Sequence, residues 1–244
     1  MSEYTSDSYS YTAETAAPAV AAAAGLETAI GALGAVAGVG GLAIMSTLAI
    51  CERFRQQGAA LERQGCAPLD ARLKALGQVP LLNAAVAATG TPLGSVAGLT
   101  VADFDRRLYQ AEERLFQAEG TVLRAQLGGA LAELGYTVVP PRRAQETAPV
   151  LLAHRPDGTA VAARISPRAG RVELDLSGFR GDACQVERAR LDAALRKRGV
   201  RLTTEARQRH QTLAGAALTR AVEAELGPRP AQTATQTKAQ RLRT

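Results

Sequence analysis

The most regular pattern of apolar and polar positions lies between Val101 and Val122. Apolar side chains recur there at alternating spacings of three and four residues, which is a heptad stripe along one face of a helix. The stripe consists of Val101, Phe104, Leu108, Ala111, Leu115, Ala118 and Val122. Thr100 and Asp103 predict the start of this helix, as a hydroxyl N-cap and an acidic first turn. Because the stripe is short for an autonomous coiled coil, we expect it to pack against the helix predicted over residues 30–60.

Shorter signals predict further helices on either side. Residues 52–74 alternate charged and apolar groups, which predicts exposed helices broken near residues 65–68, and a short helix is expected over 81–88. Gly120 predicts a kink or an end in the heptad helix. A separate helix is then expected over residues 121–134.

After Gly135, which is expected to cap the preceding helix, the pattern changes to a period of two. This period is typical of strands in a sheet with one polar face. The expected strands cover residues 136–139, 150–154, 159–166, 170–176 and 200–202. A helix predicted over 183–198 places Cys184, Leu191 and Leu195 on one stripe, which can cover the apolar face of the sheet.

These elements predict an α+β fold. Its N-terminal half would be an Ala/Gly-rich helical hairpin or bundle, followed by a small antiparallel sheet covered by helices. Residues 1–17 are rich in Ser, Thr and Tyr and are expected to be a disordered tail. The helical region would span 18–120, and the α+β module 121–227, ending in a helix that starts at residue 203 or 204. A second disordered tail is expected over 228–244.

The uncharged run from Ile30 to Cys51 would measure roughly 33 Å as one helix, long enough to cross a bilayer. Arg53 follows it, so a spanning helix would have its C-terminal side in the cytoplasm. Many glycines lower the apolarity of the run, and no Trp or Tyr flanks it. Gly34 and Gly38 would permit close packing in lipid or in water. A membrane span and a buried or self-associating helix therefore both remain as interpretations of residues 30–51.

The net charge of +6 is concentrated in the C-terminal half of the chain. Residues 136–244 hold twenty basic and ten acidic side chains, a net charge of +10. Such a half can bind nucleic acid or another anionic surface. The candidate anion-binding residues are Arg196, Arg198 and Arg201. The alternative is that Arg196 and Arg198 complement the dipole at a helix end, and that the Arg and Ala content reflects a GC-rich genome.

The sequence contains little catalytic or metal-binding chemistry. Its three cysteines have no CxxC spacing, and no P-loop, nucleophile elbow or HExxH motif occurs. No metal, cofactor or enzymatic activity is therefore predicted. Cys184 is interpreted as a core thiol because no base is near it in the sequence. The cysteine usage and the absence of a basic segment before the first apolar stretch predict a cytoplasmic protein.

The candidate partner-binding site is the turn Gly178, Phe179, Arg180, Gly181 and Asp182. Its glycines permit a tight turn, Arg180 can project, and the following helix start can receive an anionic group. The alternative is an ordinary strand-to-helix turn, in which Asp182 caps the helix and Phe179 fills the core.

Two stretches also resemble conserved families. Residues 170–184, GRVELDLSGFRGDAC, resemble small bacterial proteins of unknown function in which a hairpin runs into Gly-Phe-x-Gly-x-x-Cys and a helix. Residues 127–139, LGGALAELGYTVV, resemble the opening helix and strand of a conserved family of plastids and cyanobacteria. The resemblance covers about residues 121–202. It implies a small α+β accessory module encoded beside, and working with, an AAA+ ATPase, and it implies no catalytic residues.

The sequence thus predicts a non-enzymatic accessory or adaptor protein that assembles through its helices, as a homo-oligomer or with a protein partner. The partner implied by the resemblance is an AAA+ ATPase of a bacterial stress or defence system. The alternatives are an Arg-rich nucleic-acid-binding module and a membrane-associated protein anchored by residues 30–51.

Overall fold

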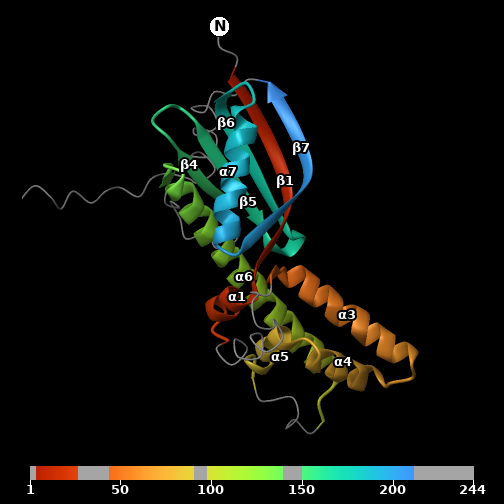
Figure 1. The fold of residues 1–244 in the computed structure, drawn as a ribbon. Coiled ribbons are helices and arrows are strands. Elements are labelled where there is room, and N and C mark those ends of the chain that lie inside the picture. Colours follow the sequence, from red (N-terminus) through yellow and green to blue (C-terminus); the bar gives the residue numbers. More distant parts are fainter. Residues whose placement is uncertain (1–3, 27–43, 91–97, 140–149, 212–244) are drawn as a thin grey trace, which may run out of the picture.

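The fold is α+β, as predicted, and its sheet is antiparallel throughout (Figure 1). The computed structural model describes residues 4–26, 44–90, 98–139 and 150–211. The strands are β1 (Tyr4–Ala16), β2 (Ile44–Met45), β3 (Thr137–Val139), β4 (Val150–His154), β5 (Ala160–Ser166), β6 (Arg171–Arg180) and β7 (Val200–Gln211). Their order across the sheet is β7-β1-β6-β5-β4-β3, and β2 pairs with the last residues of β1.

The helices are α1 (Ala17–Ala23), α3 (Thr47–Arg63), α4 (Pro68–Gly77), α5 (Pro80–Ala87), α6 (Val101–Glu133) and α7 (Ala183–Lys197). A 3-10 turn, η2 (Pro167–Ala169), joins β5 to β6. The predicted helices over 81–88 and 183–198 are confirmed as α5 and α7, and the predicted break near 65–68 separates α3 from α4. The four strands predicted between residues 136 and 176 are confirmed as β3 to β6.

One long helix organises the molecule. Helix α6 has 33 residues, which corresponds to roughly 50 Å. Its N-terminal half packs with α1, α3, α4 and α5, and we call this part the helical lobe; its C-terminal half packs with α7 on the sheet, and we call this part the sheet lobe (Figure 1). Each lobe has its own hydrophobic core. Phe104 and Leu115 of α6 belong to the core of the helical lobe, and Leu127 and Leu131 belong to that of the sheet lobe.

Gly120 does not kink or end this helix, contrary to the prediction, because α6 continues through it. A Cβ at Gly120 would lie 3.0 Å from Cγ of Pro167 in η2. The glycine therefore marks a close approach between the helix and the β5–β6 turn. The predicted N-cap is confirmed, since Oγ1 of Thr100 accepts the backbone N–H of Asp103 at 3.1 Å. Gly135 also ends the helix as predicted, with a φ of 84°.

The predicted disordered tail over 1–17 is wrong, because residues 4–16 form the long strand β1 between β6 and β7. The segment alternates with a period of two. Tyr9, Tyr11 and Ala13 are buried against the helices, whereas Ser8 and Ser10 lie on the other face and are only partly buried. The sheet consequently begins near the N-terminus, so the α+β unit is not confined to residues 121–227.

A single helix over residues 30–51 is also ruled out. Ile44 and Met45 form β2, and Ser46 caps α3 by accepting the N–H of Ala49 at 3.1 Å. Residues 27–43 lie outside the described part of the chain. Among the described residues, none of the helices combines the length and apolarity that a membrane span requires.

The predicted helix after residue 203 is wrong up to Gln211, because β7 pairs with β1 along residues 200–211. Apolar Val200 and Leu202 face the core, which suits a strand, and the pairing with β1 extends it far beyond the predicted residues 200–202. The remainder of the predicted helix and the predicted tail over 228–244 lie outside the described residues.

A buried carboxyl group joins the start of α3 to the middle of α6. Glu119 is 2% exposed, and its Oε2 accepts the backbone N–H of Thr47 at 3.1 Å. Burial raises the pKa of Glu119 to about 7, against the opposing effect of this hydrogen bond. The group is therefore easier to keep protonated in the folded protein than in the unfolded chain.

We expect Glu119→Gln to remove a pH-dependent loss of stability. As pH rises from about 4.5 through about 7, the unfolded chain ionises before the folded one, so the wild type should lose roughly 3 kcal/mol relative to the variant. Urea unfolding at pH 5 and pH 8 measures this difference. Glu62→Gln, at an exposed position of α3, is the control. Parallel stability curves for wild type and Glu119→Gln would contradict the prediction.

Candidate functional site

The predicted partner-binding turn is largely structural in its geometry. Gly178, Phe179 and Arg180 are the last residues of β6. A Cβ at Gly178 would lie 2.4 Å from the carbonyl oxygen of Gly158, and Phe179 is 4% exposed in the core of the sheet lobe. The turn therefore packs β6 against the β4–β5 turn, with Phe179 filling the core. A partner-binding role for this turn stays a prediction.

Asp182 occupies the N-cap position of α7, next to Gly181, which has a φ of 55°. Its backbone carbonyl, rather than its side chain, accepts the N–H of Gln185 at 2.9 Å. The carboxylate instead accepts the side-chain amide of Gln185 at 3.1 Å. Asp182 is therefore the N-cap residue of α7, as the alternative interpretation expected, but its side chain makes no capping hydrogen bond.

The predicted anion-binding arginines lie around the turn from α7 to β7, and their role in anion binding stays a prediction. Arg198 lies against Gly129 of α6 and pairs with Glu133 at 2.6 Å. Arg196 is exposed near the C-terminal end of α7, whereas Arg201 lies on β7, opposite Glu14 of β1. Arg198 thus fastens the end of α7 to α6.

Cys184 is fully buried, as expected for a core thiol, and lies beside an unexpected polar cluster. Its Sγ donates to Oδ2 of Asp7 at 2.7 Å, and the same oxygen accepts Tyr9 Oη at 3.1 Å and Arg207 at 2.8 Å. Burial raises the pKa of Cys184, and the hydrogen bond to Asp7 raises it further. Burial also tends to raise the pKa of Asp7, but the hydrogen bonds from Cys184, Arg207 and Tyr9 hold it below its usual value.

This cluster ties β1, β7 and the first turn of α7 together. A thiol held in its protonated form is a poor nucleophile, so the geometry suits a structural role. Among the described residues, no group of His, Cys, Asp or Glu side chains is arranged to hold a metal ion.

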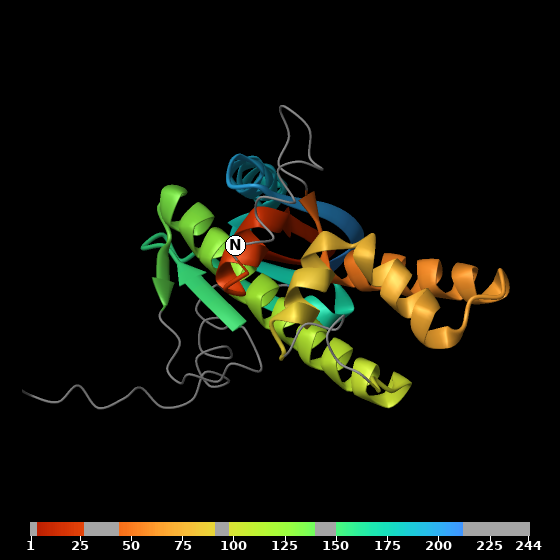
Figure 2. The ribbon, with the colours of Figure 1, turned by 90° about the horizontal axis from the view of Figure 1, so that it is seen from below.

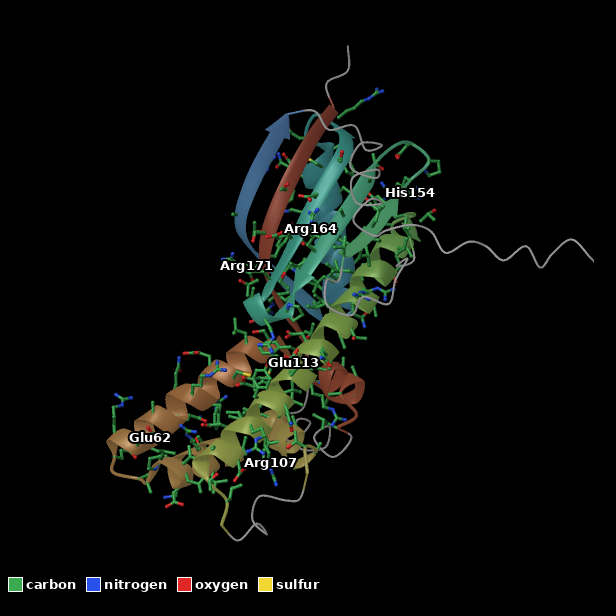
Figure 3. All side chains as sticks on the ribbon, turned by 180° about the vertical axis from the view of Figure 1, so that it is seen from behind. Glu62, Arg107, Glu113, His154, Arg164 and Arg171 are labelled. Carbon is green, nitrogen blue, oxygen red and sulfur yellow. The ribbon has the colours of Figure 1, made fainter. Side chains whose placement is uncertain are left out.

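The candidate functional site is a groove of about 1000 Å³ at the junction of the two lobes. Its walls are the C-terminal end of α1, the middle of α6, and β5 with the following turn η2. Figure 2 shows α1 lying beside α6, and Figure 3 shows Glu113 of α6 and Arg164 of the sheet, two residues that line the groove. Apolar side chains also contribute, including Phe116, Ile165 and Pro167.

The charged lining of this groove is mostly basic. Arg114, Arg124, Arg164 and Arg168 face one acidic lining residue, Glu113. Arg168 pairs with Glu113, and its guanidinium lies 5.4 Å from the ring centroid of Phe116. Arg164 pairs with Asp175 at 2.8 Å. These two arginines are thus held in place by carboxylates of the chain itself.

The other two arginines, Arg114 and Arg124, are not held in this way by a carboxylate of the described residues. Among the described residues, neither Arg114 nor Arg124 makes an ion pair with a carboxylate, and the buried Nε of Arg124 has no hydrogen-bond acceptor. A buried donor without an acceptor typically costs 1–3 kcal/mol. Because its lining carries mostly positive charge, the groove is suited to bind a group that carries carboxylate or phosphate oxygens.

Sequence reasoning missed this groove because its residues come from three distant segments. The local sequence around Arg114 and Arg124 is typical of the solvated face of a helix. Arg168 reaches the groove because the β5–β6 turn packs against Gly120.

The fold and groove define an α+β protein of two lobes with an arginine-lined groove between them. No family model, no curated protein and no solved structure matches the chain. The resemblance over residues 121–202 therefore stays a prediction.

We expect one of the three cysteines to react readily with a thiol reagent in the folded protein. Cys66 is partly exposed, whereas Cys51 and Cys184 are fully buried, and burial raises the pKa of Cys51 to about 12. Titration with DTNB should show one fast thiol in buffer and three in denaturant, and Cys66→Ser should remove the fast phase. Fast reaction of Cys184 in that variant would contradict its role as a core thiol.

Proposed function

We propose that this protein is a non-enzymatic adaptor that binds a partner protein at the junction of its two lobes. The observation that carries this proposal is the single helix α6 running through both cores. Because a continuous helix resists bending, it holds the lobes at a constant separation and orientation. A partner that contacts both lobes would therefore meet a preformed surface.

The side chains at this junction suit protein binding. Tyr109 of α6 is 61% exposed, and the guanidinium of Arg168 lies 5.7 Å from the centroid of its ring. Tyr and Arg are among the residues that contribute most to binding energy at protein interfaces. The groove beside them has both apolar and charged walls, as interface centres and their rims do.

The partner class in this proposal is an AAA+ ATPase, which the resemblance over residues 121–202 implies. Nucleic-acid binding through Arg196, Arg198 and Arg201 receives less support, because Arg198 is already paired with Glu133. The proposed membrane anchor falls mainly on residues outside the described part of the chain.

The test is reconstitution of the full chain with the purified products of the genes that flank its own. We expect one AAA+ ATPase to co-elute with it in size-exclusion chromatography and to change its ATP hydrolysis rate. Tyr109→Ala should weaken this complex by about tenfold, since truncating an interface tyrosine often costs more than 1 kcal/mol. Val186→Ala removes an apolar side chain that is 56% exposed on α7 and should leave the affinity unchanged.

Separate elution of the chain from every flanking gene product would refute the assigned partner class. Equal weakening by Tyr109→Ala and Val186→Ala would contradict binding at the junction of the lobes.

A further inference from the structure

We infer that the groove binds an extended, acidic peptide segment of the partner, with Arg114 and Arg124 as the residues that receive its carboxylates. This inference rests on the proposed function, because it specifies the chemistry of the partner at the same junction. It is carried by four features of the groove. These are its charge, the two arginines that make no ion pair with a described carboxylate, the distance between these two arginines, and the nature of the groove walls.

The first step concerns charge. Among the described residues, four arginines and one glutamate line the groove, so this part of the lining has an excess of three positive charges. Glu113 and Asp175 already neutralise Arg168 and Arg164, respectively. The remaining attraction for an anion therefore comes from Arg114 and Arg124, which line the groove and make no ion pair with a carboxylate of the described residues.

The second step concerns spacing. Arg114 and Arg124 are ten positions apart on one continuous helix, which places their Cα atoms roughly 15 Å apart. An extended ligand can meet both guanidinium groups without either side chain having to bend toward the other. An extended peptide advances about 3.3 Å per residue, so a segment of about five residues can present a carboxylate to each arginine.

The third step concerns the walls between the arginines. Ala118, Ile165 and Pro167 provide apolar surface that can contact an aliphatic side chain lying between the two acidic positions of the segment. The aromatic residue in the described lining, Phe116, is 7% exposed and therefore offers little surface for stacking a base. Single-stranded nucleic acids typically bind on exposed aromatic platforms within a continuous basic channel, so the walls favour a peptide.

Gly25 also contributes to the geometry. It follows α1 with a φ of 69°, and a Cβ at this position would lie 3.2 Å from a guanidinium nitrogen of Arg114. The absence of a side chain at residue 25 lets Arg114 lie across the end of α1, at the rim of the groove.

The test is fluorescence anisotropy with the full chain and a labelled peptide of about twelve residues, long enough to cover the groove at roughly 3.3 Å per residue. The peptide consists of Glu and Asp with single Leu residues between them. We expect saturable binding that weakens about tenfold in Arg124→Gln and several-fold in Arg114→Gln, because each loses charge-assisted hydrogen bonds. Arg124→Lys should restore part of the affinity, since it keeps the charge but not the forked donor.

The matched control is Arg53→Gln, which removes the same charge from an exposed position of α3 and should leave binding unchanged. Circular dichroism and thermal unfolding of each variant establish that the fold is retained. A peptide of the same length with Gln and Asn replacing the acidic residues should not bind.

Three results would overturn the inference: no saturation up to about 1 mM peptide, an equal loss of affinity in Arg53→Gln and Arg124→Gln, or displacement of the peptide by inorganic pyrophosphate at equal concentration. Tighter, Arg124-dependent binding of a short oligothymidylate would instead assign the groove to nucleic acid.

The inference and the proposed function can fail separately. If the chain binds an ATPase but no acidic peptide, the inference is overturned and the adaptor role stands. If it binds the acidic peptide through Arg124 but no flanking gene product, the groove is confirmed and the assigned partner class is wrong.

Discussion

The close approach of α6 to the β5–β6 turn is the constraint on which the arrangement of this molecule depends. Only hydrogen occupies the side-chain position at Gly120, and a Cβ there would lie 3.0 Å from Cγ of Pro167. The contact lets one unbroken helix pass from the helical core into the sheet core. It also places Arg168, which is next to Pro167, over the rings of Phe116 and Tyr109 of the same helix. Glycine is unfavourable within a helix by about 1 kcal/mol, so its presence here is explained by packing rather than by helix propensity.

The sheet lobe depends on contacts between the two ends of the described chain. Strand β1 lies between β6 and β7, so residues 4–15 must pair with segments that follow them by more than 150 positions. Asp7 reinforces this pairing, because it accepts hydrogen bonds from Arg207 of β7 and from Cys184 of α7. Such long-range pairing forms slowly and gains its stability only after the intervening chain has folded. The helical lobe has more local contacts, so we expect it to form first.

Features that depend on contacts between residues close in the sequence could be predicted, whereas features that depend on distant residues could not. The N-cap at Thr100, the break between α3 and α4, and strands β3 to β6 are local, and each was recognised from capping residues, turn residues or periodicity. Strand β1 also has a period of two, but its small polar residues and tyrosines are equally typical of a disordered tail. Only its burial between two strands separates these possibilities. The role of Gly120 likewise depends on Pro167, a residue 47 positions away.

The range of the interactions also decides what each basic residue contacts. Arg196, Arg198 and Arg201 lie within six residues of the sequence, but Arg196 is on α7 and Arg201 is on β7. Glu133 neutralises Arg198, which lies between these two elements. In the groove, by contrast, arginines from α6 and from the β5–β6 region converge. Whether an arginine can receive a ligand depends on whether the fold has already given it a carboxylate. For Arg164 and Arg168 the fold supplies one, and for Arg114 and Arg124 the described residues supply none. The surface that attracts an acidic partner most strongly is therefore identified by arginines without a carboxylate partner among the described residues. The density of basic residues in the sequence does not identify it.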